Sequence, residues 1–245
     1  MVHAFPRLKL PRPGGPQWRR PHRRTLDRNR IMKILHVSCS PRGALSESSR
    51  LSRRIVDLLL RLQPAAIVVE RPIGDAPVPH VDADYAEAQQ APVDMAVHGG
   101  STSCSDALIQ ELEAADTVVI GTPMHNLMVP STLKAWIDHV VRARRTFGMT
   151  REGKAGFLRD RPVFVAIASG GVFTGVNARQ PDLLTPYLRL VLGTIGLKDL
   201  RFFSVEGTAF GGDWVTRARD ETDVRLRACF ENLALHDGSF VRLSS

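Results

Sequence analysis

Five short apolar segments alternate with segments of helical periodicity, and this alternation constrains the fold more than any other feature of the sequence. Continuous apolar runs are typical of strands buried on both faces, and helices between such strands predict parallel pairing. We therefore predict an α/β fold with a doubly wound, five-stranded parallel sheet and helices on both faces. The predicted strands are residues 33–38, 65–70, 116–121, 161–168 and 200–205, and the predicted helices are residues 48–62, 105–115, 130–141, 185–192 and 214–235, with a short additional candidate near 85–90.

Residues at the predicted helix starts fit this arrangement. Pro130 suits the first turn of the helix over 130–141, because proline has a fixed φ and lacks the N–H that this position leaves unpaired. Thr185 and Pro186 are predicted as the N-cap and first residue of the helix over 185–192. Doubly wound sheets bind ligands at the carboxyl ends of their strands, where the winding reverses. The loops after the first, third and fourth strands are therefore the candidate site.

The excess of positive charge lies at the start of the chain. The formal net charge is +8, and residues 1–31 account for all of it, whereas residues 32–245 carry none. The first 31 residues also contain five prolines and no periodic apolar pattern, so they cannot bury enough surface to offset the entropy of ordering. We predict a disordered basic extension over 1–31 and one domain over 32–245, with Met32 as its natural start. A transit peptide and a nucleic-acid-binding arm are the alternatives for such an arginine-rich segment.

Cysteine usage and hydropathy exclude several classes of protein. Cys39, Cys104 and Cys229 are widely spaced and form no C-x-x-C pair or Cys/His cluster. This pattern argues against a disulfide framework or a zinc site and favours a reducing compartment, the cytoplasm. No segment approaches the ~18 apolar residues that a membrane span needs, so we expect no membrane association.

The loop after the first predicted strand is rich in hydroxyl groups. Ser40, Ser46 and Ser48 precede or open a helix, whose unpaired N–H groups and dipole favour a bound anion. Serines also cap helices in many proteins. This loop alone therefore leaves phosphate binding and simple capping equally open.

Three sharper phosphate motifs fail. The chain has no G-x-G-x-x-G pattern, and Leu45 stands where a phosphatase loop beginning at Cys39 requires an arginine. A Walker A pattern over 148–154 is followed by Ala155 instead of a hydroxyl residue, and it follows a predicted helix rather than a strand. The remaining fit is a mononucleotide phosphate held by hydroxyls and amides.

The loop after the third strand combines apolar and amide groups. Met124 and Leu127 can contact the face of a planar heteroaromatic ring, and Asn126 with the neighbouring backbone amides can bind its polar edge. His125 is a candidate general acid, although a lone loop histidine is more often a packing or hydrogen-bonding residue. After the fourth strand, the glycines of Ser169-Gly170-Gly171 permit either a close backbone approach to a ligand or a tight turn.

These segments together resemble one protein family. Pro123-Met-His-Asn-Leu127, Pro130-Ser-Thr-Leu-Lys-Ala-Trp-Ile-Asp-His139 and Ala143-Arg-Arg-Thr-Phe147 resemble the FMN-dependent NADH-azoreductase family, a quinone-reducing branch of the flavodoxin-like fold. The match is extended, in order, by Asp182-Leu-Leu-Thr-Pro-Tyr-Leu188, Gly193-Thr-Ile-Gly196 and Val205-Glu-Gly-Thr-Ala-Phe-Gly211. The resemblance runs from about residue 33 to residue 212 and implies a flavodoxin-like, FMN-binding domain over 32–245.

The resemblance also implies which residues bind the cofactor. His125 and Leu127 stand where the family usually has tyrosine and phenylalanine, Met149 replaces a frequent aromatic, and the arginine of a Ser-Arg-Gly-Gly segment is missing. Backbone amides do much of the binding, so FMN binding is still expected, whereas these changes leave the substrate preference open. The implied residues are Ser40, Ser46, Glu47 and Ser48 for the FMN phosphate, Met124, His125, Asn126 and Leu127 for the flavin ring, and Ser169, Gly170 and Gly171 for the close approach to the ring.

The implied activity is that of a homodimeric oxidoreductase. It would take hydride from NADH or NADPH and pass two electrons to a quinone or an aromatic azo compound by a ping-pong mechanism, with no side chain essential as acid or base. A non-enzymatic flavodoxin-type electron carrier is the main alternative, but carriers usually have a strongly acidic face and residues 32–245 are neutral. A nucleic-acid-binding module rests on residues 1–31 alone. An acyl-carrier-protein phosphodiesterase would need a metal cluster or an activated nucleophile, and the sequence suggests neither.

Overall fold

The computed structural model of the chain describes residues 31–90 and 100–236. The chain divides into two units, Met1–Arg30 and Ile31–Ser245, and the structure described below belongs to the second. The extension predicted over 1–31 therefore lies, apart from Ile31, outside the described residues. Among the helices that are described, none is long and apolar enough to cross a membrane.

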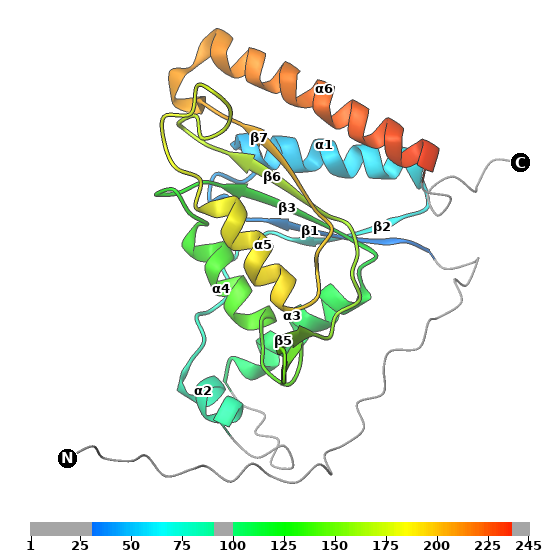
Figure 1. Cartoon of the computed structure of the whole chain (residues 1–245), viewed down its shortest axis with the longest axis vertical. Helices are drawn as coiled ribbons and strands as arrows, with labels where there is room; N and C mark the ends of the chain where they lie inside the picture. Colours follow the sequence, from blue (N-terminus) through cyan, green and yellow to red (C-terminus); the bar gives the residue numbers. More distant parts are fainter. Residues whose placement is uncertain (1–30, 91–99, 237–245) are drawn as a thin grey trace, which may run out of the picture. The chain divides into compact units, whose positions relative to one another are not determined.

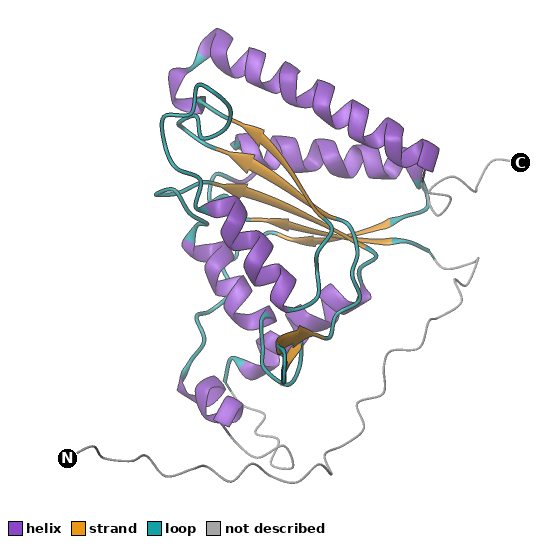
Figure 2. Cartoon of the chain, viewed as in Figure 1, coloured by secondary structure: helices purple, strands orange, loops and turns teal. Residues whose placement is uncertain are grey.

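Five parallel strands form the central sheet in the order β2-β1-β3-β6-β7 (Figure 1), and Figure 2 shows the strands in orange. The winding therefore reverses between β1 and β3, the pattern of flavodoxin-like sheets. This arrangement confirms the predicted fold class. The strands are β1 (Lys33–Ser38), β2 (Ile67–Arg71), β3 (Thr117–Pro123), β6 (Val163–Ala168) and β7 (Leu200–Val205).

Helices cover both faces of this sheet (Figure 1). On one face lie α1 (Glu47–Leu62) and α6 (Gly212–His236), and on the other lie α3 (Thr102–Ala114), α4 (Ser131–Val140) and α5 (Leu184–Thr194). The short candidate near 85–90 is α2 (Ala83–Gln90).

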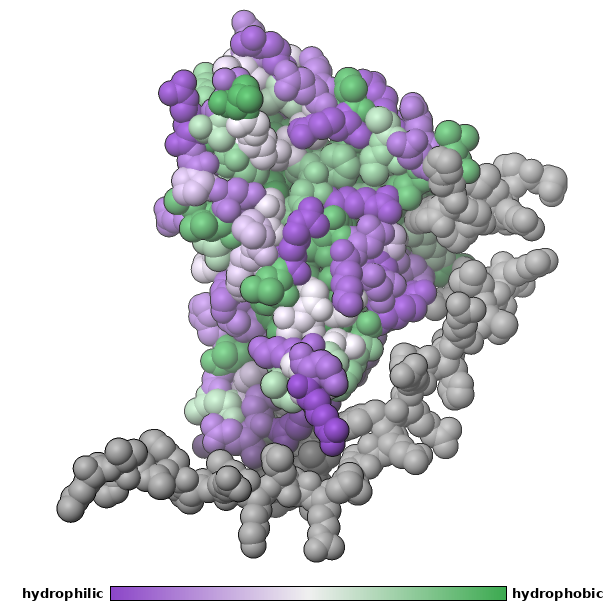
Figure 3. All heavy atoms as spheres, viewed as in Figure 1, coloured by the Kyte–Doolittle hydropathy of each residue, from purple (hydrophilic) through white to green (hydrophobic). Residues whose placement is uncertain are grey.

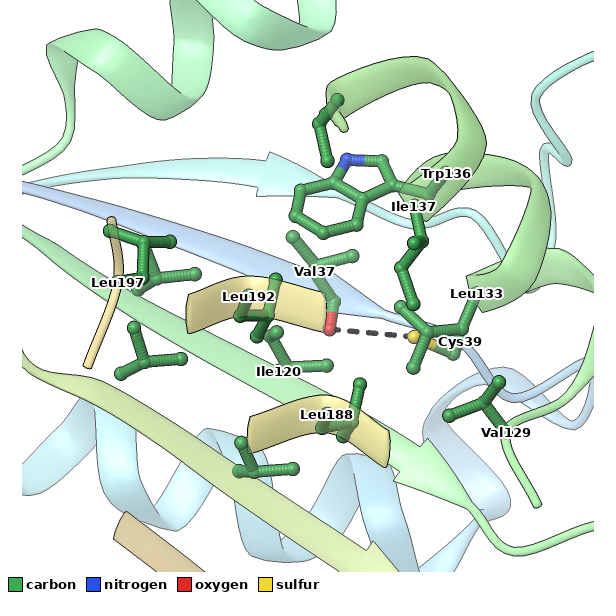
Figure 4. Close-up of a cluster of buried hydrophobic side chains, with 14 of the residues drawn as sticks. Val37, Cys39, Ile120, Val129, Leu133, Trp136, Ile137, Leu188, Leu192 and Leu197 are labelled. Carbon is green, nitrogen blue, oxygen red and sulfur yellow. Dashed lines mark hydrogen bonds between the residues drawn. The ribbon is translucent and has the colours of Figure 1, made fainter. Parts of the chain in front are cut away.

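Each face has its own core of buried aliphatic side chains. Under α3, α4 and α5 the core includes Trp136, which is 1% exposed, together with Leu133, Leu188 and Leu192 (Figure 4). Burial of such side chains contributes about 1.5–3 kcal/mol each, so the two cores hold the strand ends at fixed positions. The loops at the carboxyl ends of the strands therefore stand on a rigid base.

Apart from shifts of up to three residues in the bounds of several elements, two features differ from the predictions. The antiparallel hairpin of β4 (Phe147–Thr150) and β5 (Gly153–Gly156) was not predicted, because its glycines hide the alternation of a strand; it contains the Walker-like pattern, which is therefore no phosphate loop. The predicted N-cap role of Thr185 is wrong. Leu183 holds the N-cap position, and Asp182 just before it supplies the capping, accepting hydrogen bonds from the N–H groups of Leu184 (3.0 Å) and Thr185 (2.9 Å).

Candidate functional site

A cavity of ≈ 590 Å³ opens at the carboxyl ends of β1, β3 and β6. This is the edge where the winding reverses and where ligands of such sheets bind. Its walls come from the loops after β1, β3, β6 and β7 and from the start of α6. The lining residues are Ser40, Pro41, Arg42, Leu45, Ser46, Glu47, Ser48, Pro123, Met124, His125, Ala168, Gly170, Thr208, Gly212, Val215 and Arg219.

One end of the cavity, the serine end, is formed by Ser40, Ser46 and Ser48. Ser46 is the N-cap of α1, and its Oγ accepts a hydrogen bond of 3.1 Å from the N–H of Ser49. The N–H groups of Glu47 and Ser48 have no acceptor among the described residues. Unpaired N–H groups at a helix start form a binding site for an anion. Capping and phosphate binding, which the sequence left as alternatives, are thus compatible in one loop.

Charged side chains surround the serine end. Glu47 accepts hydrogen bonds from Arg219 Nε at 2.9 Å and from Arg50 Nε at 3.0 Å. The hydrogen bond from Arg219 lowers the pKa of Glu47, Arg50 acts in the same direction, and partial burial opposes both. Glu47 is therefore an anion tied to two arginines, and it links α1 to α6.

The other end of the cavity, the ring end, is formed by Met124, His125, Ala168 and Gly170. Met124 is 8% exposed, so it presents only an edge to the cavity, whereas His125 is exposed at the rim. A β-type pair joins His125 and Met128 by hydrogen bonds of 2.9 and 3.0 Å, which closes a two-residue turn.

Asn126 and Leu127 form that turn with φ values of 49° and 69°. Positive φ at both positions is the signature of a type I′ turn, and it is strained for a leucine. Neither residue lines the cavity. Their predicted contact with a flavin ring stays a prediction.

The loop after β6 is held in place by a hydrogen bond from Gln180. Ser169 is 2% exposed, and its Oγ accepts a hydrogen bond of 3.0 Å from Gln180 Nε2. A Cβ on Gly171 would lie 2.2 Å from Gln180 Oε1, so a larger residue would displace the amide of Gln180 from Ser169. Gly170 lines the cavity, whereas Ser169 and Gly171 support it from outside the lining. Close approach of Gly170 to a flavin ring stays a prediction.

Several lining residues were missed from the sequence. Four lining residues follow β7, namely Thr208, Gly212, Val215 and Arg219. They were not predicted because only the loops after the first, third and fourth strands were considered as the candidate site. All parallel strands have their carboxyl ends at the same edge of the sheet, so the loop after the fifth strand could have been included in the predicted site. Arg42 was also not predicted, although it lies between Ser40 and Ser46 in the loop after β1.

Nucleophilic chemistry has little support in the described part of the chain. Burial raises the pKa of the Cys39 thiol, which packs beside Val129 and Leu133 (Figure 4). His36 lies 2.9 Å from Ser52 Oγ and 2.8 Å from Glu70 Oε2, but Ser52 is fully buried, so no substrate reaches its hydroxyl. Within residues 31–90 and 100–236, no group of three or more His, Cys, Asp or Glu side chains could hold a metal ion.

Comparisons with known proteins agree with this geometry. A family profile described as flavodoxin-like fold matches residues 32–229. An "FMN-dependent NADH:quinone oxidoreductase 4" of Pseudomonas fluorescens is 45% identical over 188 residues, which cover 77% of this chain and 90% of the relative. A relative from Cupriavidus pinatubonensis, "FMN-dependent NADH:quinone oxidoreductase 2", is 42% identical over 206 residues, 83% of this chain and 98% of the relative.

A solved structure also has this fold. It is an FMN-dependent NADH-azoreductase from Bacillus anthracis in complex with FMN, with a TM-score of 0.70 over 83% of this chain and 100% of that chain. At 23% identity, this likeness supports the fold alone.

Proposed function

Since the chain belongs to the flavodoxin-like family that includes the FMN-dependent NADH:quinone oxidoreductases, we propose that it is itself such an enzyme. It takes hydride from NADH and passes two electrons to a quinone or an aromatic azo compound. NADH is preferred over NADPH as the proposed donor because the relatives are named for it.

The observation that carries this proposal is the cavity at the reversal of the sheet, with chemically different ends. The serine end offers two unpaired amides and buried hydroxyls, which suit a phosphate. The ring end offers Met124, Ala168 and a glycine without a side chain, which suit the flat face of an isoalloxazine. The volume of ≈ 590 Å³ lies in the range of cofactor sites. The residues present therefore fit FMN.

Bound FMN would supply the redox chemistry, accepting hydride from the nicotinamide and delivering two electrons to the acceptor. The chain itself binds and orients. Gly170 permits close approach, and the buried Met124 fixes the depth of the ring end. His125, exposed at the rim, is close enough to the cavity to exchange a proton with a product, a task that water can share. Since donor and acceptor use one cavity in turn, we expect ping-pong kinetics.

An electron carrier without enzymatic activity is a weaker interpretation. The curated relatives are named as oxidoreductases, and residues 32–245 have no net charge with which to dock a redox partner by an acidic face.

We further propose that the enzyme is a cytoplasmic homodimer. Free cysteines Cys39, Cys104 and Cys229 suit a reducing compartment. On the face shown in Figure 3, hydrophobic side chains are interspersed with polar ones. Leu190 of α5 is 75% exposed and Met149 of β4 is 74% exposed, and in the proposed dimer a partner protomer would cover such side chains. Light scattering of the protein as it elutes from a size-exclusion column measures its molar mass, which should be that of a dimer.

A spectrum and a steady-state assay test the enzymatic proposal. The purified protein, loaded with FMN if necessary, should absorb at flavin wavelengths and oxidise NADH with menadione as acceptor. A protein that binds no FMN would refute the proposal. FMN binding without NADH oxidation would favour the carrier.

A further inference from the structure

Two arginines reach the serine end of the cavity from separate elements. Arg42 lies in the loop after β1, and Arg219 lies in α6. Both line the cavity together with Ser40, Ser46 and Ser48. The serine end therefore has two cationic side chains in addition to hydroxyls and amides.

Arg219 is held in a defined position by Glu47. Its Nε donates to Glu47 Oε2 at 2.9 Å, and its Nη2 donates to Glu47 Oε1, so the pair is bidentate. A guanidinium has five N–H groups, and this pair uses two of them. The side chain remains 39% exposed where it lines the cavity, which leaves three N–H groups for another acceptor. A planar guanidinium fixed on one edge is suited to bind phosphate oxygens with the other.

Arg42 is available in a different way. Its backbone N–H donates to Ser40 Oγ at 3.2 Å, which fixes the loop, while its side chain is exposed. No ion pair of its guanidinium is found within the described residues. The charged side chains that line the cavity are Arg42, Glu47 and Arg219, so one positive charge is left uncompensated at this end.

We propose that Arg42 and Arg219 bind the phosphate of FMN and make the site selective for phosphorylated flavin over riboflavin. This inference rests on the proposed function and assigns two residues to it. A phosphate monoester carries a charge of about −1.5 to −2 near neutral pH. Amides and hydroxyls supply only partial positive charges, and the resident carboxylate of Glu47 opposes a second anion. The two guanidinium groups supply the full charges that make a phosphate favourable beside it.

Flavin titrations of the full-length apoprotein test this assignment. Dissociation constants for FMN and for riboflavin are measured by flavin fluorescence for the wild type, Arg42→Ala and Arg219→Ala. We expect each substitution to weaken FMN binding about tenfold, as for loss of a charge-assisted hydrogen bond, and to change riboflavin binding less than about twofold. The FMN affinity of both variants should also depend less on salt.

Matched controls separate a phosphate contact from a general change in net charge. Arg53→Ala on α1 and Arg217→Ala on α6 remove one exposed arginine each from the same elements, and neither residue lines the cavity. Both controls should bind FMN within about twofold of the wild type. Circular dichroism checks that every variant is folded.

Each outcome decides the inference. Equal weakening for FMN and riboflavin, or no weakening in either variant, would overturn it. If Arg219→Ala fails to fold, Arg42→Ala alone decides, because Arg42 is an exposed loop residue with no described ion pair. A wild type that does not bind FMN refutes the proposed function as well, whereas FMN binding that is insensitive to both arginines refutes only this assignment.

Discussion

Replacing Gly121 with alanine tests whether close packing of α1 against β3 holds the serine end in position. An added Cβ would lie 2.5 Å from Ser52 Oγ, 2.8 Å from Ser52 Cβ and 3.1 Å from the carbonyl oxygen of Ser48. Ser52 is fully buried, and its Oγ lies 2.9 Å from His36 Nε2, so its side chain has no open space to enter. The first turns of α1 must therefore shift away from the sheet.

The expected cost follows from these contacts. Overpacking of a tight interface costs about 1–3 kcal/mol. Loss of the buried Ser52–His36 hydrogen bond would add about 1 kcal/mol. Alanine offsets about 0.4–1 kcal/mol of this by restricting the unfolded chain. We expect Gly121→Ala to lower the free energy of unfolding by about 1–3 kcal/mol and to weaken FMN binding, because the unpaired amides of α1 move with it.

Urea unfolding followed by circular dichroism measures the stability of the apoprotein, and fluorescence titration measures FMN binding. Gly193→Ala in α5 is the matched control: its Cβ would meet nothing within 4 Å, so it should stabilise the chain by about 0.5–1 kcal/mol. Combining Gly121→Ala with Ser52→Ala should cost less than the sum of the single changes, because it removes the closest contact. A Gly121→Ala protein within about 0.5 kcal/mol of the wild type would refute the reasoning.

Three other predictions concern charge, proton transfer and the basic extension. Glu47 has a lowered pKa in the fold, so its ion pairs stabilise the chain at pH values above the pKa of about 4.3 that Glu47 has in the unfolded chain. This stabilisation is lost as the pH falls through the pKa of Glu47 in the folded chain. The difference in free energy of unfolding between the wild type and Glu47→Gln, measured by urea unfolding, should therefore shrink over that pH range and not widen. His125→Ala should keep kcat within about tenfold of the wild type at equal FMN occupancy, since an essential general acid typically contributes about 10²–10⁴-fold; a larger loss in the steady-state assay contradicts a dispensable histidine. Deleting residues 1–31 should leave the melting temperature and the activity unchanged, and loss of either would show that the extension belongs to the domain.

The sheet was predictable because its strands are local apolar runs. Residues 33–38 and 200–205 were predicted to the residue, as β1 and β7. Ligands bind where the winding of such a sheet reverses, and this rule predicted the position of the cavity from the order of the strands alone. Seven of the eleven predicted site residues line it, namely Ser40, Ser46, Glu47, Ser48, Met124, His125 and Gly170.

Other local features were beyond pattern analysis. The β4–β5 hairpin is stabilised by close contacts that only glycine permits: a Cβ on Gly156 would lie 2.2 Å from the backbone nitrogen of Gly196, forty residues away. The side chain of Asp182, two residues before α5 begins, accepts the capping hydrogen bonds. Thr185 and Pro186 match the preferred capping sequence, but they lie inside the first turn of the helix. In both cases a distant or displaced contact outweighs the local preference.

Glu47 shows why the charges at the site could not be derived from the loop that contains it. An acidic residue in the first turn of a helix is favoured by the helix dipole. The same dipole and the same amides would favour a bound phosphate, so a carboxylate there should compete with the cofactor. Arg219, 172 residues further along the chain, resolves the conflict by pairing with Glu47 while still lining the cavity. Because α6 brings that arginine back to the start of α1, Glu47 is compatible with an anion site in the folded chain, although its carboxylate alone would oppose one.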